Sequence, residues 1–100
     1  DLEILQYIYN NACQNGYESF NQFIDSVTHW WPNGRLAGAN LQSRNDPVWQ
    51  LCGDYALPEN IGNLTELWYL DIGLFGQDIT SLPESIGNLF HHSIFDLVLW

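Results

Sequence analysis

Cysteine and histidine are the side chains in this sequence with the widest range of chemistry, and they fall into two groups. Cys13 and His29 have the types of a nucleophile and its general base, whereas His91, His92 and Asp96 have the types of zinc ligands. Nothing in the sequence orients the first pair, and the second group has no further ligand nearby. The HExxH, GxSxG and glycine-rich phosphate motifs are also missing. We therefore predict no catalytic site, no bound metal and no cofactor.

The two cysteines, Cys13 and Cys52, permit one disulfide and do not require it. A bridge suits a small extracellular unit, whereas two buried thiols suit any compartment because free cysteine behaves as a small hydrophobe. The thiol alternative is slightly favoured here. Neither cysteine has a partner at CxxC spacing, so a zinc or thioredoxin-type site has no support. The location stays open between the cell exterior and the cytoplasm.

The charge of the chain is strongly acidic, and this excludes several kinds of partner. Twelve carboxylates stand against two arginines and no lysine, which gives a formal net charge of −10. Phosphate backbones and anionic lipid heads are bound through lysine and arginine, so we expect neither nucleic acid nor a membrane surface as a partner. Hydrophobic residues make up 46% of the 100 residues, which is enough for one small domain with a packed core.

A repeated octapeptide organises the second half of the chain. Residues 57–64 have the sequence LPENIGNL, and residues 82–89 repeat seven of these eight types after 25 residues. Downstream of the first copy, Leu70 and Ile72 alternate with polar residues, which predicts a short strand with both side chains facing the core. The apolar spacing within residues 82–89 predicts one turn of helix or a 3-10 segment. Such a unit cannot bury its apolar residues alone, so copies are expected to stack.

The pattern LxxLxLxx followed by LPxxIGNL resembles the leucine-rich repeat, in the form common in plant-type and bacterial repeat proteins. The resemblance implies an α/β leucine-rich repeat solenoid, with short parallel strands on a concave face and helical or 3-10 segments outside. Residues 48–100 are then expected to hold two to three repeats. Residues 1–47 are expected to form an α-helical N-terminal cap and a loop. The apolar end of the chain predicts further repeats after Trp100.

Within the first half, periodicity predicts two helices, a loop and a strand. Residues 2–9 place apolar side chains on one helical face. Ser19 or Glu18 is expected to open a second helix that ends at the following Trp-Pro-Asn-Gly motif. Residues 33–47 are rich in Gly, Asn, Ser and Asp and are expected to form a loop. Residues 48–51 are expected to form the first strand of the sheet.

The strand of the first repeat supplies the candidate binding site. Trp68, Tyr69 and Asp71 occupy the variable positions, which point to the concave surface of the fold that the repeats resemble. The 25-residue shift places Asp96 beside Asp71. Exposed tryptophan and tyrosine are common binding anchors, and two neighbouring carboxylates suit a basic partner. We therefore expect a non-catalytic module that binds a protein or peptide ligand, with basic ligands favoured.

Two functions of other classes stay open. The chain can be the sensor or regulatory segment of a larger enzyme, such as a receptor-like kinase or a ligase effector. Alternatively, the repeats can assemble or space subunits through the apolar residues near Trp100. Resemblance to a fold does not decide between these functions, because one fold supports many.

Overall fold

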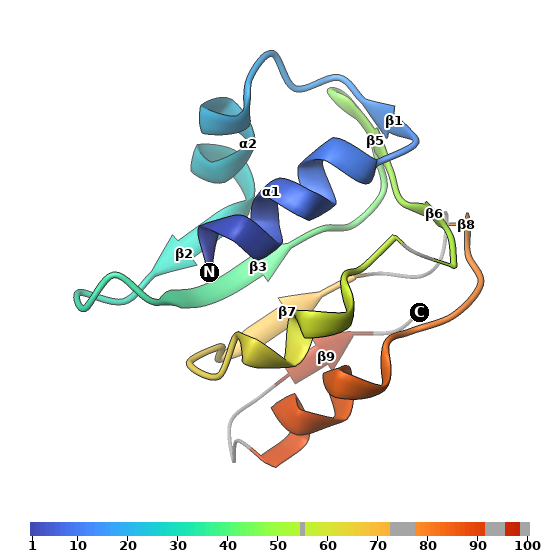
Figure 1. Ribbon diagram of the computed structural model, residues 1–100. Coiled ribbons are helices and arrows are strands. Elements are labelled where there is room, and N and C mark those ends of the chain that lie inside the picture. The colour runs from blue at the N-terminus through green and yellow to red at the C-terminus, as the bar shows by residue number, and fades with distance from the viewer. Residues whose placement is uncertain (55, 73–77, 92–95, 99–100) are drawn as a thin grey trace.

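The computed structural model describes residues 1–54, 56–72, 78–91 and 96–98. Helices and short strands alternate along these residues (Figure 1). The first half contains α1 (Leu2–Asn11), β1 (Gln14–Asn15), α2 (Phe20–Val27), β2 (Thr28–Trp30), β3 (Leu36–Asn40), β4 (Arg44–Asn45) and β5 (Val48–Gln50). The second half contains β6 (Cys52–Gly53), the 3-10 helix η1 (Glu59–Asn63), β7 (Tyr69–Asp71), β8 (Asp78–Ile79), the 3-10 helix η2 (Glu84–His91) and β9 (Asp96–Val98).

Both predicted α-helices are confirmed. In α1, the apolar residues Ile4, Leu5 and Ile8 recur at helical spacing and all three are buried. Ser19 caps α2, because its side-chain oxygen accepts a hydrogen bond from the backbone N–H of Gln22 at 3.1 Å. The second helix ends at Val27, earlier than expected, and β2 follows it directly.

The strands β2 and β3 form an antiparallel hairpin that was not predicted. Its turn contains Asn33 and Gly34, with Gly34 at φ +85°, a conformation that glycine adopts without steric cost. The Trp31 N–H donates to the Arg35 carbonyl at 2.8 Å and closes the turn. The expectation of a loop over residues 33–47 was therefore wrong for β3, whose residues are mostly buried, and for β4.

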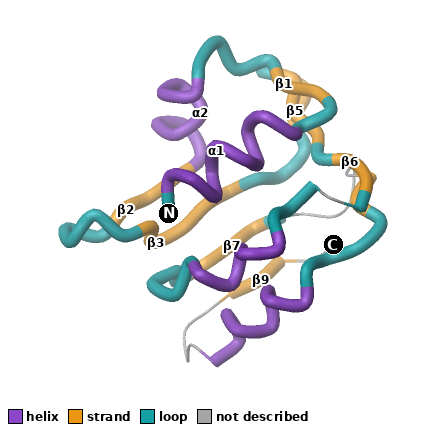
Figure 2. Tube along the Cα trace, viewed as in Figure 1, coloured by secondary structure: helices purple, strands orange, loops and turns teal. Residues whose placement is uncertain are grey.

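The largest sheet has the order β2-β3-β7-β9 and combines the hairpin with two parallel pairings. The predicted strand around Leu70 is confirmed as β7, and Leu70 and Ile72 are both buried as expected. The predicted 3-10 segment of the second repeat is confirmed as η2. The helix α1 and the short helices of the two repeats lie on the same side of this sheet, the side of the buried Leu70 (Figures 1 and 2).

Two smaller sheets complete the described strands. One has the order β1-β5-β4 with antiparallel pairing, and the other pairs β6 with β8 in parallel. The predicted strand at residues 48–51 is present as β5, but it belongs to the antiparallel sheet. The expectation that it begins the sheet of the repeats was wrong, and β3 lies next to β7 instead.

The expected leucine-rich repeat solenoid with a helical cap is corrected by this topology. The described residues form a small compact α/β unit with extents of 32 × 29 × 20 Å, and no solenoid is evident among them. The physical reason lies in the proportions of the chain. Only two copies of the repeat are present, while residues 1–56 add two helices and antiparallel strands to the same core. The division of the chain at residues 47 and 48 stays a prediction.

One hydrophobic core joins the two halves of the chain. Leucine and isoleucine from both repeat copies pack in the same cluster as the apolar face of α1. At the other end of this cluster, Phe23 packs against Trp49 with ring centroids 4.9 Å apart, and Tyr17 contacts both rings edge-on. The Trp49 side chain is 1% exposed, and its indole N–H donates to the Leu41 carbonyl at 3.3 Å. Aromatic residues therefore provide much of the buried volume of the first half.

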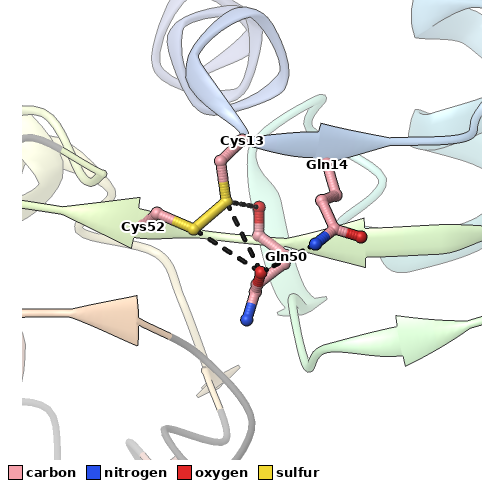
Figure 3. Close-up of a disulfide and its surroundings, with 4 residues drawn as sticks. All are labelled: Cys13, Gln14, Gln50 and Cys52. Carbon is pink, nitrogen blue, oxygen red and sulfur yellow. Dashed lines mark hydrogen bonds between the residues drawn. A yellow bond between two sulfur atoms is a disulfide. The ribbon is translucent and has the colours of Figure 1, made fainter.

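Cys13 and Cys52 form a disulfide, so the slight preference for free thiols was wrong. The bridge joins the segment after α1 to β6, across a sequence separation of 39, with the two Cα atoms 5.8 Å apart. Figure 3 shows Gln50 beside the two sulfur atoms, where its side-chain oxygen also accepts a hydrogen bond from Gln14 at 3.1 Å. The Cys13 N–H donates to the Gln50 carbonyl at 3.0 Å, so the backbone on one side of the bridge is fixed as well.

Candidate functional site

The candidate site is the strand face, which we define as the side of the four-stranded sheet opposite the buried Leu70. Tyr69 and Asp71 lie on this face because side chains alternate along a strand, and both are half-buried while Leu70 is 1% exposed. The pairing register adds Gly38 of β3 beside Tyr69 and Asn40 beside Asp71. The face is therefore built from the predicted strand and from the hairpin that sequence reasoning missed.

The Tyr69 side chain extends from β7 across β3 to β2. In register, Tyr69 pairs with Gly38, and Gly38 pairs with His29 on the next strand. A side chain at position 38 would overlap the Tyr69 ring, so glycine leaves the space that the ring fills. The ring packs edge-on against His29 with centroids 5.9 Å apart, and its hydroxyl lies 3.4 Å from His29 Nδ1. His29 itself is exposed.

Asp71 is held in place by the residues that follow β3. The Gln42 side-chain amide donates to Asp71 Oδ2 at 2.6 Å, and the Leu41 N–H donates to the Asp71 carbonyl at 2.7 Å. Its other carboxylate oxygen, Oδ1, is buried without a hydrogen-bond partner in the described part of the chain. The ion pair found among the described residues joins Arg35 to Asp1, so Asp71 has no cation of its own there.

The environment of Tyr69 changes its acidity. Burial raises the pKa of the Tyr69 phenol above its ordinary value, and the negative charge of Asp71 raises it further. Both causes act in the same direction because each disfavours the phenolate. Tyr69 is therefore a neutral hydroxyl at physiological pH, able to donate or accept a hydrogen bond beside the Asp71 carboxylate.

Trp68 lies one residue before β7, at the end of the sheet next to the β2–β3 hairpin. Its ring stacks on Trp31 with centroids 6.4 Å apart, and it remains 50% exposed. Trp31 is fixed by its indole N–H, which donates to the Glu66 carbonyl at 2.7 Å. The Trp68 N–H donates to the Ala37 carbonyl at 2.7 Å. The two tryptophans therefore form an ordered apolar platform at the start of β7.

Asp96 does not lie where the 25-residue shift placed it. The register pairs Asp96 with Tyr69, and it is Val98 that pairs with Asp71. The prediction that Asp96 lies directly beside Asp71 was therefore wrong: Asp96 lies two residues earlier in β9, beside Tyr69.

The other chemistry-bearing residues do not assemble into a reactive site in the described ranges. Cys13 is bonded to Cys52, so it is not available as a thiolate nucleophile beside His29. Among residues 1–54, 56–72, 78–91 and 96–98, no group of three or more His, Cys, Asp or Glu side chains is placed to hold a metal ion. His92 lies outside the described residues.

Two surface hollows occur away from the strand face. One, of about 400 Å³, is lined by Glu59, Pro83, Glu84 and Ser85 between the two 3-10 helices. The other, of about 290 Å³, lies near Arg35 and the first residues of α1. Neither of these two hollows includes Tyr69 or Asp71.

Sequence reasoning did not place His29, Gly38, Gln42 and Trp31 beside the site residues, although a local signal for the hairpin exists. An Asn-Gly pair between two possible strands is the strongest short-range indication of a hairpin. Here it stands between β2 and β3, but it was interpreted as a turn that leads into a loop.

Comparisons of the chain with protein-family models, with curated proteins and with solved structures returned no match. Function is therefore inferred from the side chains of the strand face and their surroundings. Within the described ranges, the helices are too short and too polar to cross a membrane.

Proposed function

We propose that this chain is a non-catalytic recognition module that binds a basic protein or peptide segment on its strand face. The observation that carries the proposal is that ordered aromatic rings lie near a carboxylate for which the described residues show no ion pair. Tyr69 is fixed over Gly38, Trp68 is stacked and half exposed, and Asp71 is oriented by Gln42.

The aromatic residues supply the apolar part of recognition. Tryptophan and tyrosine bury a large area at low entropic cost, and they are enriched among the residues that dominate binding energy. Trp31 and Trp68 already hold each other in one geometry, so less conformational freedom is lost when a ligand packs on them. This pre-ordering favours binding through the platform over a purely structural role.

Electrostatics support a basic ligand. The chain carries a net charge of −10, which attracts cationic partners and repels anionic ones. At the strand face, a lysine or arginine side chain would pair with Asp71 and pack along the neighbouring Tyr69 ring. The resemblance of residues 57–64 and 82–89 to leucine-rich repeats also supports protein recognition. This proposed function does not require a solenoid.

The experiment is a selection from a random peptide library with the folded chain as target. We expect enriched peptides to be rich in Lys and Arg, and their affinity to fall as salt is added, because exposed charges are screened. Trp68→Ala and Tyr69→Ala should each weaken binding by roughly tenfold or more, with an unchanged circular dichroism spectrum. Asp71→Asn should remove the preference for basic peptides.

Leu2→Ala is the matched control, because Leu2 is an apolar side chain of similar exposure, 53%, on α1 at the other side of the sheet. This variant should bind the selected peptides like the unmodified chain. The proposal is wrong if no peptide binds above an unrelated acidic protein, or if the selected peptides bind all variants equally.

A further inference from the structure

We propose that Asn63 is a site of N-linked glycosylation, a modification independent of the binding function proposed above. Asn63, Leu64 and Thr65 form an Asn-x-Thr triplet, the acceptor sequence for this modification when x is not proline. Asn63 and Leu64 belong to the repeated octapeptide, and Thr65 follows it directly. In the sequence alone, the triplet is therefore explained equally well as part of the repeat. Three structural observations separate the two explanations.

The first observation is the exposure of the acceptor. Asn63 is the last residue of η1, and its side chain and that of Thr65 are exposed, whereas Leu64 between them is 1% exposed. The contact described for Asn63 uses its backbone carbonyl, which accepts a hydrogen bond from Arg35 at 3.3 Å. The side-chain amide is therefore open to solvent in the described structure, and a sugar attached there would not disturb the core.

The second observation is the disulfide between Cys13 and Cys52. Disulfides form and persist in oxidising compartments such as the secretory pathway, and they are rare in the reducing cytosol. N-linked oligosaccharides are attached in the same pathway. The bridge therefore places the acceptor triplet where the modification takes place, and it does so independently of the triplet itself.

The third observation is the position of Asn63 relative to the strand face. η1 lies on the side of the sheet that carries α1, as the yellow-green ribbon in Figure 1 shows. An oligosaccharide attached to η1 would therefore start on the side of the sheet opposite Tyr69 and Asp71. Glycosylation and ligand binding on the strand face are therefore compatible.

The second repeat provides an internal comparison. Asn88 is equivalent to Asn63 and is also exposed, but Phe90 replaces Thr65, so Asn88 is not in an acceptor triplet. If the triplet were only part of the repeat, Asn63 and Asn88 would be expected to behave in the same way. Glycosylation requires modification of Asn63 and not of Asn88.

The reaction transfers a preassembled oligosaccharide from a lipid diphosphate donor by a membrane-bound oligosaccharyltransferase. A bond forms between Asn63 Nδ2 and the anomeric carbon of the first sugar, and the bond from that carbon to the phosphate oxygen breaks. The amide nitrogen loses one proton, the lipid diphosphate leaves with the bonding electron pair, and nothing is oxidised or reduced.

The test translates the chain, fused to a cleavable secretion signal, in the presence of microsomes, with cleavage of the signal as proof of entry. We expect the chain to gain one oligosaccharide that peptide N-glycosidase removes, with conversion of Asn63 to aspartate. Asn63→Gln and Thr65→Ala should abolish the gain, whereas Thr65→Ser and the matched control Asn88→Gln should retain it. An unmodified chain after signal cleavage, or a gain that survives Asn63→Gln, overturns the proposal.

A second measurement tests the natural state. Mass spectrometry of the Asn63 peptide, from protein isolated from the organism that makes it, should show the oligosaccharide before enzymatic release. A peptide that is entirely unmodified in that material overturns the proposal, whatever the microsomes show. Neither result depends on peptide binding to the strand face, so the two proposals fail separately.

Discussion

The ring of Tyr69 in β7 occupies the space that any side chain at Gly38 in β3 would fill. This contact couples the hairpin of the first half to the first repeat, because the two residues are paired in register on neighbouring parallel strands. Glycine is needed here for the close approach of the ring and not for an unusual backbone angle. The orientation of a candidate binding residue therefore depends on the absence of a side chain 31 positions earlier.

Gly38→Ala is expected to destabilise the fold by about 1–3 kcal/mol, because the added methyl group overpacks against the Tyr69 ring. Urea unfolding followed by tryptophan fluorescence measures the change. Combining Gly38→Ala with Tyr69→Ala should restore part of the loss, since the overlapping ring is removed. Gly87→Ala is the matched control, because no atom lies within 4 Å of the position of its Cβ. Equal effects of the two glycine substitutions would contradict this account.

Asp1→Ala is expected to destabilise the fold by about 0.5–1.5 kcal/mol, because the partly buried Leu36 N–H and the Arg35 guanidinium lose the carboxylate that accepts their hydrogen bonds. The Asp1 carboxylate accepts from Arg35 Nε at 2.9 Å, from Arg35 Nη2 at 3.2 Å and from the Leu36 N–H at 2.8 Å, and its side chain is only 8% exposed. Thermal unfolding measures the loss. Glu3→Ala, at an exposed position two residues later, should change the midpoint little; a similar loss there would point to a general helix effect.

Local patterns were sufficient to predict the elements whose burial follows their own periodicity. The helix α1, the Ser19 cap, β7 and η2 all have apolar or capping residues at the expected spacing. Tyr69 and Asp71 could be assigned to one face for the same reason, because alternation in β7 needs no knowledge of its neighbours.

The partners of those two residues could not be predicted, because they depend on tertiary contacts. β3 has the sequence Leu-Ala-Gly-Ala-Asn, in which alanine and glycine have low strand preference and no clear alternation. Its burial comes from the strands on either side and from the Tyr69 ring over Gly38. The disulfide escaped prediction for a similar reason, since spacing in the sequence does not reveal whether the fold brings the two cysteines within bonding distance.

Removal of the disulfide should cost about 2–4 kcal/mol of stability, because the bridge closes a long loop and restricts the unfolded chain. The double variant Cys13→Ser with Cys52→Ser, compared with the oxidised chain in urea unfolding, measures this loss. Reducing agent should destabilise the unmodified chain to the same extent and leave the double variant unchanged. If reduction does not change the unfolding midpoint of the unmodified chain, the bridge does not contribute to stability.

The raised pKa of Tyr69 predicts a loss of stability at alkaline pH. At lower pH the phenol is protonated in both the folded and the unfolded states, so it gives no pH dependence. As pH rises through the unfolded pKa, the unfolded state releases its proton first, and the free energy of unfolding falls until pH passes the higher folded pKa. Tyr69→Phe should reduce this alkaline slope in urea unfolding.

Asp71→Asn separates the two causes of the shift. It removes the negative charge and should lower the Tyr69 pKa part of the way, while burial, the larger cause, keeps it above the ordinary value. Titration of the ring carbon bonded to the hydroxyl by nuclear magnetic resonance, assigned by comparison with Tyr69→Phe, measures the pKa directly. A Tyr69 that titrates at the ordinary tyrosine value in the unmodified chain would show that its ring is more solvated than the packing over Gly38 requires.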